Sequence, residues 1–273
     1  MAYRMIVLDL DDTLLREDLT ISPRTKASLM RAQAQGVKVV LASGRPTGAI
    51  WRYARELELA AHGGWIISFN GAVVTDCTTG SVVFEQALAR ELIHEIHDLA
   101  CEHDAGILSY VNDQIVTPRA NPWTEVERTL TGMDVVEVPD FKKAIVEDAI
   151  KVIVVDEPER LKETADRLRP RVEGRMNMVI SKPFFLEFTS LGIDKKHSLG
   201  HLADRLSVNS DEVLAVGDSY NDLGMLQWAG LGVCMANGPQ AVRDAADHVT
   251  GSNMDDGVAQ ALDRFVFGEF SEA

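Results

Sequence analysis

The stretch MIVLDLDDTLL, residues 5–15, joins an apolar segment directly to three aspartates. Its first four residues form the short, uninterrupted apolar run that is typical of a fully buried parallel strand. Asp9, Asp11 and Asp12 follow at the end of that run, where carboxylates repel each other and lose hydration. Such a cluster is unfavourable unless a cation or a substrate uses it, so this strand end is a candidate functional site.

Strand and helix patterns alternate along the flanking sequence. Apolar runs at residues 37–42 and 65–69 each follow a helical pattern, and the same alternation returns over residues 195–267. Short connections between alternating strands and helices are typical of a parallel, doubly wound sheet. We therefore predict an α/β fold with a Rossmann-like, doubly wound parallel core formed by residues 1–83 and 190–273.

The segment between these two parts has a different order of elements. A predicted hairpin at residues 72–84 is followed by an amphipathic helical pattern at 89–103, and then by short strand patterns around one further helix. We predict that residues 84–189 form a separate α+β domain inserted into the core.

Composition and charge narrow the classes of partner. The 273-residue chain has a formal net charge of −15, which argues against nucleic acid, because affinity for phosphate backbones depends on Lys and Arg. No apolar run approaches the roughly 20 residues that span a bilayer, so we expect no membrane association. We find no signal-peptide pattern at the N-terminus, and the three cysteines are widely spaced and odd in number. We therefore expect a cytoplasmic protein; its oligomeric state stays open.

Polar residues gather at the ends of four predicted core strands. In open parallel α/β sheets, ligands bind outside the carboxyl ends of the strands. Four loops bring carboxylate, hydroxyl and amide groups, and flexible glycines, to that edge: residues 9–13, Ser43 to Arg45, Asn70 with Gly71, and Gly217 to Asp222. This convergence predicts one composite site.

The carboxylates of this site favour a hard cation. Asp9 and Asp11 lie two apart on an extended segment and are therefore expected to share a face, and Asp218 can approach from a neighbouring strand. An oxygen-only cluster without His or Cys favours Mg²⁺ over zinc. Acidic residues at strand ends can also be mere loop or capping residues, but the convergence with the other loops disfavours that interpretation.

Four segments carry a family resemblance: DLDDTL, VLASGR, GIDKKHSL and GDSYNDLGML. They resemble, in order and spacing, the four motifs of the haloacid dehalogenase superfamily of aspartate-nucleophile phosphatases. MANGPQAV, SNMDDGVA and the large insert resemble the Cof-type branch, subfamily IIB, with a C2B cap domain. Asp12 departs from the pattern, because many members have glycine there; we interpret Asp12 as a capping residue or as a neighbour of the metal ligands.

The resemblance implies the roles of the carboxylates. Asp9 would be the nucleophile that forms an aspartyl-phosphate, and Asp11 the general acid and then the general base. Mg²⁺ would be held by the Asp9 side chain, the Asp11 backbone carbonyl and the Asp218 side chain. Asp222 would orient the catalytic lysine or the waters on the metal.

The resemblance also implies which groups bind the phosphoryl oxygens. They are the Ser43 hydroxyl, the Leu10 and Gly44 backbone N–H groups, Lys195 and Asn221. Lys196 is adjacent to Lys195, but Lys195 occupies the family position.

The expected function is a Mg²⁺-dependent phosphatase that hydrolyses phosphate monoesters of small metabolites, such as sugar phosphates. Alternatives are a phosphomannomutase-like phosphoryl transferase, which would interconvert hexose phosphates without net phosphate release, and a non-enzymatic phospho-acceptor like a receiver domain. The insert is expected to determine the substrate. The sequence leaves open which of five residues faces the core: Arg119, Asn121, Trp123, Lys182 or Phe184.

One further pattern lies in the insert. His94 and His97 are three apart on the predicted helix, with Cys101 one turn further on, and these residue types can ligate zinc. Their spacing does not match a known zinc helix, so a solvated helix face is the favoured interpretation.

Overall fold

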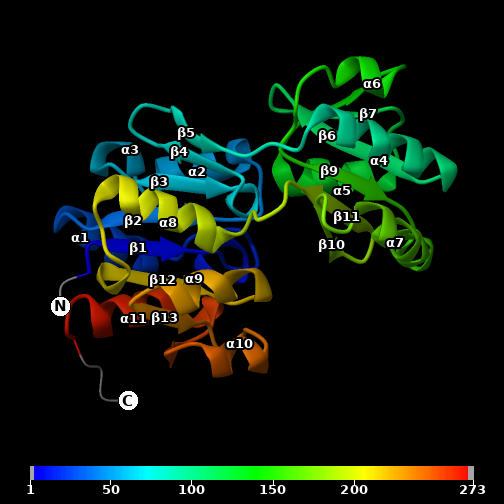
Figure 1. Cartoon of the computed structure of the whole chain (residues 1–273). Coiled ribbons are helices and arrows are strands. Elements are labelled where there is room, and N and C mark those ends of the chain that lie inside the picture. Colours follow the sequence, from blue (N-terminus) through cyan, green and yellow to red (C-terminus); the bar gives the residue numbers. More distant parts are fainter. Residues whose placement is uncertain (1–2, 270–273) are drawn as a thin grey trace. The chain divides into compact units, whose positions relative to one another are not determined.

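The computed structural model describes residues 3–269 (Figure 1). The chain forms two compact units. The first contains the residues up to Phe84 and those from Asp194 onward, and the second is the insert, Glu85–Ile193. The sequence pattern predicted an insert over residues 84–189.

An eight-stranded sheet forms the centre of the first unit, in the order β14-β13-β12-β1-β2-β3-β4-β5. Neighbouring strands from β14 to β3 are parallel, and β4 is antiparallel to β3. The predicted parallel α/β core is thus confirmed. The strands are β1 (Met5–Leu8), β2 (Lys38–Ala42), β3 (Trp65–Ser68), β4 (Val73–Asp76), β5 (Val82–Glu85), β12 (Val213–Gly217), β13 (Leu231–Cys234) and β14 (His248–Val249).

Helices cover both faces of this sheet (Figure 1). Ile6 and Leu8 of β1 pack in one cluster with residues of α1, α2 and α11, whereas Met5 and Val7 pack in another with residues of α8, α9 and α10. Burial on both faces explains the continuous apolar run that opens the chain. The helices are α1 (Pro23–Ala34), α2 (Thr47–Glu56), α3 (Leu59–His62), α8 (Lys195–Leu206), α9 (Leu223–Trp228), α10 (Gln240–Ala245) and α11 (Gly257–Phe265).

Local sequence accounts for where the first helices begin and end. The Ser22 hydroxyl accepts a hydrogen bond from the Thr25 N–H at 3.1 Å and caps α1, with Pro23 at the first helical position. The pattern at residues 47–60 predicts a single helix, but the structure has two. Glu58 adopts the left-handed conformation (φ 54°), which ends α2 and starts α3.

The insert is built on a six-stranded sheet in the order β10-β11-β9-β6-β7-β8. All its paired strands are antiparallel except β7 and β8. Its strands are β6 (Gly106–Val111), β7 (Gln114–Thr117), β8 (Val135–Glu137), β9 (Val152–Val155), β10 (Asn177–Lys182) and β11 (Phe185–Thr189). Its helices are α4 (Arg90–Glu102), α5 (Pro122–Thr131), α6 (Phe141–Ala144) and α7 (Pro158–Val172).

Three of the candidate specificity residues of the insert have partners within it. The Asn121 side chain caps α5 by accepting hydrogen bonds from the backbone N–H groups of Trp123 at 2.9 Å and Thr124 at 3.1 Å. The Trp123 and Phe184 rings are stacked, with centroids 4.5 Å apart and an interplanar angle of 11°. Asn121 therefore has a structural role as a helix cap.

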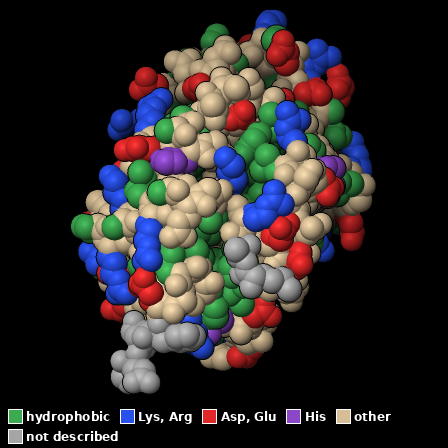
Figure 2. Space-filling view, turned by 90° about the vertical axis from the view of Figure 1, so that its left-hand side faces the viewer, with side chains coloured by type: hydrophobic (Ala, Val, Ile, Leu, Met, Phe, Trp, Pro, Cys, Tyr) green, Lys and Arg blue, Asp and Glu red, His purple; other side chains and the backbone are tan. Residues whose placement is uncertain are grey.

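The surface carries mixed charge. On the face shown in Figure 2, Lys and Arg side chains are interspersed with Asp and Glu side chains. No helix in the described part of the chain has the length and apolar character needed to cross a membrane. Cys77, Cys101 and Cys234, all among the described residues, are free thiols; Cys77 and Cys234 are buried and Cys101 is exposed.

Candidate active site

The site lies at the carboxyl ends of the central strands. Asp9 directly follows β1, and its backbone N–H donates to the Val216 carbonyl of β12 at 3.0 Å. Ser43 follows β2, and its N–H donates to the Ile67 carbonyl of β3 at 2.9 Å. These ladder bonds fix the first residue of each loop to the neighbouring strand, so the loops begin from a rigid edge.

A buried ion-pair network forms the centre of the site. The Lys195 ammonium contacts the Asp9 carboxylate and lies 2.6 Å from Asp222 Oδ1. Lys195 and Asp222 are only 1% and 0% exposed, and Asp9 is 6% exposed. Lys196 is exposed. The structure therefore distinguishes the two adjacent lysines, and Lys195 is the one that reaches the aspartates.

Asp222 is held by three donors. Its second carboxylate oxygen accepts the backbone N–H groups of Asp218 at 3.1 Å and Ser219 at 3.0 Å. Gly217 makes room for this arrangement, because a Cβ added there would lie 2.6 Å from the Asp222 side chain. With these donors and Lys195 bound, Asp222 is suited to orient the lysine.

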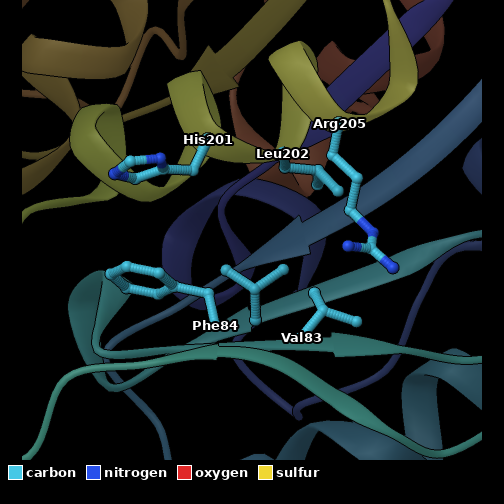
Figure 3. A pocket seen from close by; sticks show the side chains of 6 residues that line it. Val83, Phe84, His201, Leu202 and Arg205 are labelled. Carbon is cyan, nitrogen blue, oxygen red and sulfur yellow. The ribbon is translucent and has the colours of Figure 1, made fainter.

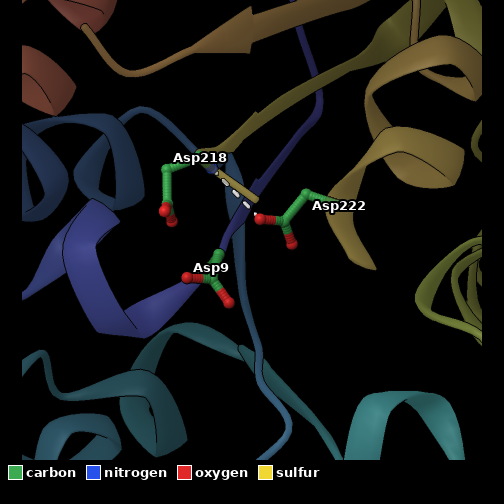
Figure 4. A group of neighbouring side chains, drawn as sticks. All are labelled: Asp9, Asp218 and Asp222. Carbon is green, nitrogen blue, oxygen red and sulfur yellow. Dashed lines mark hydrogen bonds between the residues drawn. The ribbon is translucent and has the colours of Figure 1, made fainter. Parts of the chain in front are cut away.

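Asp218 completes a cluster of three carboxylates with Asp9 and Asp222 (Figure 4). Each offers one oxygen, and these oxygens all lie within 4.8 Å of one another. The Thr13 hydroxyl donates to Asp218 Oδ1 at 2.8 Å. All the possible ligand atoms are oxygens, which suits a hard cation such as Mg²⁺.

Burial shifts the protonation of this cluster. Burial raises the pKa of Asp9 well above its ordinary value; the Lys195 charge opposes this, and the charges of Asp222 and Asp218 add to it. Burial also raises the pKa of Asp218 to about 6. The Thr13 hydrogen bond lowers this pKa, and the charge of Asp222 raises it. Burial alone would lower the pKa of Lys195, but its two carboxylate partners outweigh that effect and raise it. One ammonium thus faces three carboxylates, an imbalance that a divalent cation would relieve.

Asp11 has a different environment. Its side chain is 48% exposed and pairs with Arg45 through both oxygens, at 2.8 Å from Nε and 2.5 Å from Nη2. The Arg45 backbone N–H also donates to the Ser43 hydroxyl oxygen at 3.2 Å. The loop after β2 thus supplies both a hydroxyl for the site and a guanidinium that fixes Asp11.

The remaining phosphate-binding candidates lie in two neighbouring loops. The Asn221 amide donates to Asn70 Oδ1 at 3.0 Å. A Cβ added to Gly44 would lie 3.1 Å from the same Asn70 side chain, so glycine allows the loops after β2 and β3 to approach closely. The Asn70 backbone N–H also donates to the Ser43 carbonyl at 2.9 Å, so Ser43, Gly44 and Asn221 all adjoin Asn70. Leu10 has a fully buried side chain and can offer only its backbone.

Asp12 occupies a backbone position that favours glycine. Its φ is 60°, in the left-handed region, where aspartate is among the better tolerated residues. The Asn237 side chain donates to the Asp12 carbonyl at 2.7 Å, and Asn253 donates to the Leu15 carbonyl at 2.9 Å. The two C-terminal motifs thus support the turn that follows Asp9.

No individual role was predicted from the sequence for Arg45, Asn70 or Thr13. All three lie in the strand-end loops that were singled out, so their place at the shared edge was a usable signal. Their partners were not predictable, because Asp11 and Asn221 lie 34 and 151 residues away.

A family model described as haloacid dehalogenase-like hydrolase matches residues 6–262. The chain belongs to this family, and within it to the phosphatases. It is 34% identical over 272 residues to the Bacillus subtilis protein named "Putative phosphatase YxeH", covering 98% of this chain and 100% of that protein.

Two further similarities extend over nearly the whole chain. The Bacillus subtilis 5-amino-6-(5-phospho-D-ribitylamino)uracil phosphatase YcsE is 28% identical over 264 residues, covering 96% of each chain. The crystal structure of a haloacid dehalogenase-like hydrolase from Bacteroides thetaiotaomicron has a TM-score of 0.92 and 38% identity, covering 96% of this chain and 99% of that one. The resemblance seen in the sequence motifs is thus confirmed.

Proposed function

We propose that this phosphatase hydrolyses phosphate monoesters of small metabolites with Mg²⁺, through an aspartyl-phosphate formed on Asp9. The observation that carries the proposal is the buried contact of Asp9 with Lys195, inside a cluster of three carboxylates at the end of β1. Lys195 and a bound cation would offset the negative charge of the phosphoryl group, so a carboxylate at this position can attack it.

The Asp9 and Asp218 side chains and the Asp11 backbone carbonyl would hold the Mg²⁺. Bound there, Mg²⁺ would lower the pKa of the neighbouring carboxyl groups and neutralise part of the substrate's charge. Asp222 already accepts from Lys195 and from two backbone N–H groups, so we give it the task of positioning the lysine rather than of binding metal.

In the first step, an Asp9 carboxylate oxygen attacks phosphorus and the bond to the leaving alcohol breaks. Asp11, in its protonated form, gives that alcohol a proton. Lys195, the Ser43 hydroxyl, the Asn221 amide and the backbone N–H groups of the two neighbouring loops donate to the phosphoryl oxygens. In the second step, Asp11 takes a proton from water, which attacks phosphorus; phosphate leaves and the Asp9 carboxylate is regenerated.

The substrate class follows from the chemistry and from the relatives. YcsE is named for a small phosphorylated ribitylamino compound. The net negative charge of the chain does not oppose a small phosphorylated substrate, because a bound divalent cation would make the local charge at the site positive. We assign the choice among such metabolites to the insert, as the resemblance implies.

The decisive experiment measures phosphate release from p-nitrophenyl phosphate and a panel of sugar phosphates, with and without Mg²⁺. We expect Mg²⁺-dependent turnover in the wild type and no detectable turnover in Asp9→Asn. Asp12→Asn is the matched control, because it removes a neighbouring exposed carboxylate and should retain activity. Turnover that survives in Asp9→Asn would exclude Asp9 as the nucleophile.

The role of Asp11 is tested by the leaving group. In Asp11→Asn, a good leaving group such as p-nitrophenolate departs without a proton, so we expect a burst of one equivalent followed by slow turnover. Sugar phosphates, whose alkoxide leaving groups need the proton, should show no burst. Interconversion of hexose 1- and 6-phosphates by the wild type, without phosphate release, would instead support a mutase. Stable phosphorylation without turnover would support a phospho-acceptor.

A further inference from the structure

Two histidines lie one turn apart on the outer surface of α8. His197 and His201 are both exposed, and they are four residues apart, the spacing that places side chains on the same face of a helix. The helix begins at Lys195, and the Asp194 side chain caps it by accepting the His197 backbone N–H at 2.6 Å. The pair is therefore carried by a firmly capped helix and does not depend on a loop.

The nitrogens of the pair point at each other. The two Nε2 atoms are 3.1 Å apart, and the rings meet edge to face, with centroids 4.6 Å apart and an interplanar angle of 84°. Two nitrogens that each bind one ion at about 2.05 Å, with an angle between about 90° and 109° at the metal, lie about 2.9–3.3 Å apart. The observed spacing falls within that interval.

An aromatic wall orients the pair. The Phe84 ring stacks on His201 with centroids 5.2 Å apart and an interplanar angle of 23°, and it meets His197 edge to face at 6.1 Å. The Phe84 and His201 rings border a cavity of about 170 Å³ between the β4–β5 hairpin and α8. In Figure 3, His201 and Phe84 lie at one end of this cavity and Arg205 at the other. The imidazole positions are thus set by packing as well as by helix geometry.

We propose that His197 and His201 form a second cation site, which binds a late transition-metal ion such as Zn²⁺, Ni²⁺ or Cu²⁺. Imidazole nitrogens suit these ions, whereas the oxygen-only carboxylate cluster suits Mg²⁺, so the two sites differ in the ions that they prefer. The protein supplies two ligands and water completes the coordination shell. An ion bound there would link the first two turns of α8, directly after Lys195.

The other histidine cluster provides an internal comparison. On α4, His94 Nε2 is engaged with the Ile145 carbonyl at 3.0 Å. His97 Nε2 lies 3.8 Å from Cys101 Sγ, and its ring stacks on Phe141 with centroids 5.3 Å apart. The nitrogen and the sulfur are further apart than about 3.6 Å, the separation expected for tetrahedral zinc. This pair is therefore the weaker candidate and serves as the matched control.

The test is a calorimetric titration with ZnCl₂ of protein already saturated with Mg²⁺. The wild type is compared with His197→Gln, His201→Gln and the control His97→Gln. Glutamine is a good helix former and both α8 positions are exposed, so the variants should fold, which circular dichroism checks. We expect Zn²⁺ to bind at least tenfold more weakly to both α8 variants, and His97→Gln to match the wild type. We also expect Zn²⁺ to raise the melting temperature of the wild type more than that of either α8 variant.

Three results would overturn the proposal. Equal Zn²⁺ binding by the wild type and both α8 variants would reduce the pair to a simple N–H···N hydrogen bond. Loss of binding in only one of them would contradict chelation by both rings. Loss in His97→Gln alone would assign the site to α4. Because the readout is binding and not turnover, none of these results bears on the proposed phosphatase reaction.

Discussion

Replacing Lys195 with methionine tests the charge balance of the site. Lys195→Met keeps roughly the length of the side chain but removes the ammonium that pairs with Asp9 and Asp222. The group is almost fully buried, and breaking a buried ion pair by removing one partner costs about 3–5 kcal/mol. We therefore expect the free energy of unfolding, measured by urea denaturation in EDTA, to fall by that amount, and turnover to be lost.

Mg²⁺ and pH should each change this deficit in a defined direction. At 100 times its dissociation constant, a cation bound by Asp9 and Asp218 stabilises either protein by about 2.7 kcal/mol. Because it replaces part of the positive charge that the variant lacks, we expect it to bind the variant more tightly and so to reduce the deficit at a given Mg²⁺ concentration. A carboxyl group whose pKa is raised in the folded state binds its proton more tightly there, so stability falls as pH rises through the raised pKa. Asp218, with a pKa of about 6 in the wild type, places this window near pH 4–6. Lys195 lowers the pKa of both Asp9 and Asp218, so without it both pKa values rise further and the variant loses more stability than the wild type as pH rises. The deficit should be larger at pH 8 than at pH 5.

Lys196→Met is the matched control, because it makes the same substitution at the next, exposed residue. We expect it to change the free energy of unfolding by less than about 0.5 kcal/mol. The reasoning would be refuted if Lys195→Met cost less than about 1 kcal/mol in EDTA, or if the two variants were equally destabilised.

Three further predictions concern single residues. Arg45→Lys loses the paired hydrogen bonds that fix its carboxylate partner, so kcat/KM for sugar phosphates should fall by about tenfold; unchanged steady-state kinetics would remove Arg45 from the mechanism. Asp12→Gly should change the free energy of unfolding, measured by urea denaturation, by less than about 1 kcal/mol. Asp12→Val should lower it by about 1–2 kcal/mol, because valine is β-branched and is strained at φ 60°. Iodoacetamide at pH 8 should modify Cys101 alone by intact mass, because burial raises the pKa of Cys77 to about 12 and that of Cys234 to about 11; a second adduct on the native protein would contradict this.

The fold could be predicted from the sequence because its signals are local. Apolar runs such as residues 5–8 are continuous where helices cover both faces of the sheet, and the alternation with helical patterns indicates parallel strands. The helix predicted over residues 47–60 was wrong in one respect. Its break at Glu58 depends on a single left-handed residue, and nothing in the local pattern marks that residue as such.

The site was predictable as a place but less so as a set of contacts. Strand order brings the loops after β1, β2, β3 and β12 to one edge, so Asp9, Ser43 and Asp218 could be grouped before any distance was known. The partners within that edge depend on side-chain geometry. The sequence placed Asp9 and Asp11 on one face, yet the first is buried against Lys195 and the second is paired, half exposed, with Arg45.

This difference in environment suits the two roles that the proposed reaction requires. A nucleophile must stay ionised beside an anionic substrate, and Asp9 lies where an ammonium and a bound cation can hold its charge. A general acid must gain and lose a proton within each cycle, which requires access to the leaving group and to water. Asp11 is half exposed and therefore open to water, and its guanidinium partner can hold the carboxylate in place after the proton has left. The crowding of aspartates after β1 therefore places two carboxylates two residues apart in separate environments, one buried and one open.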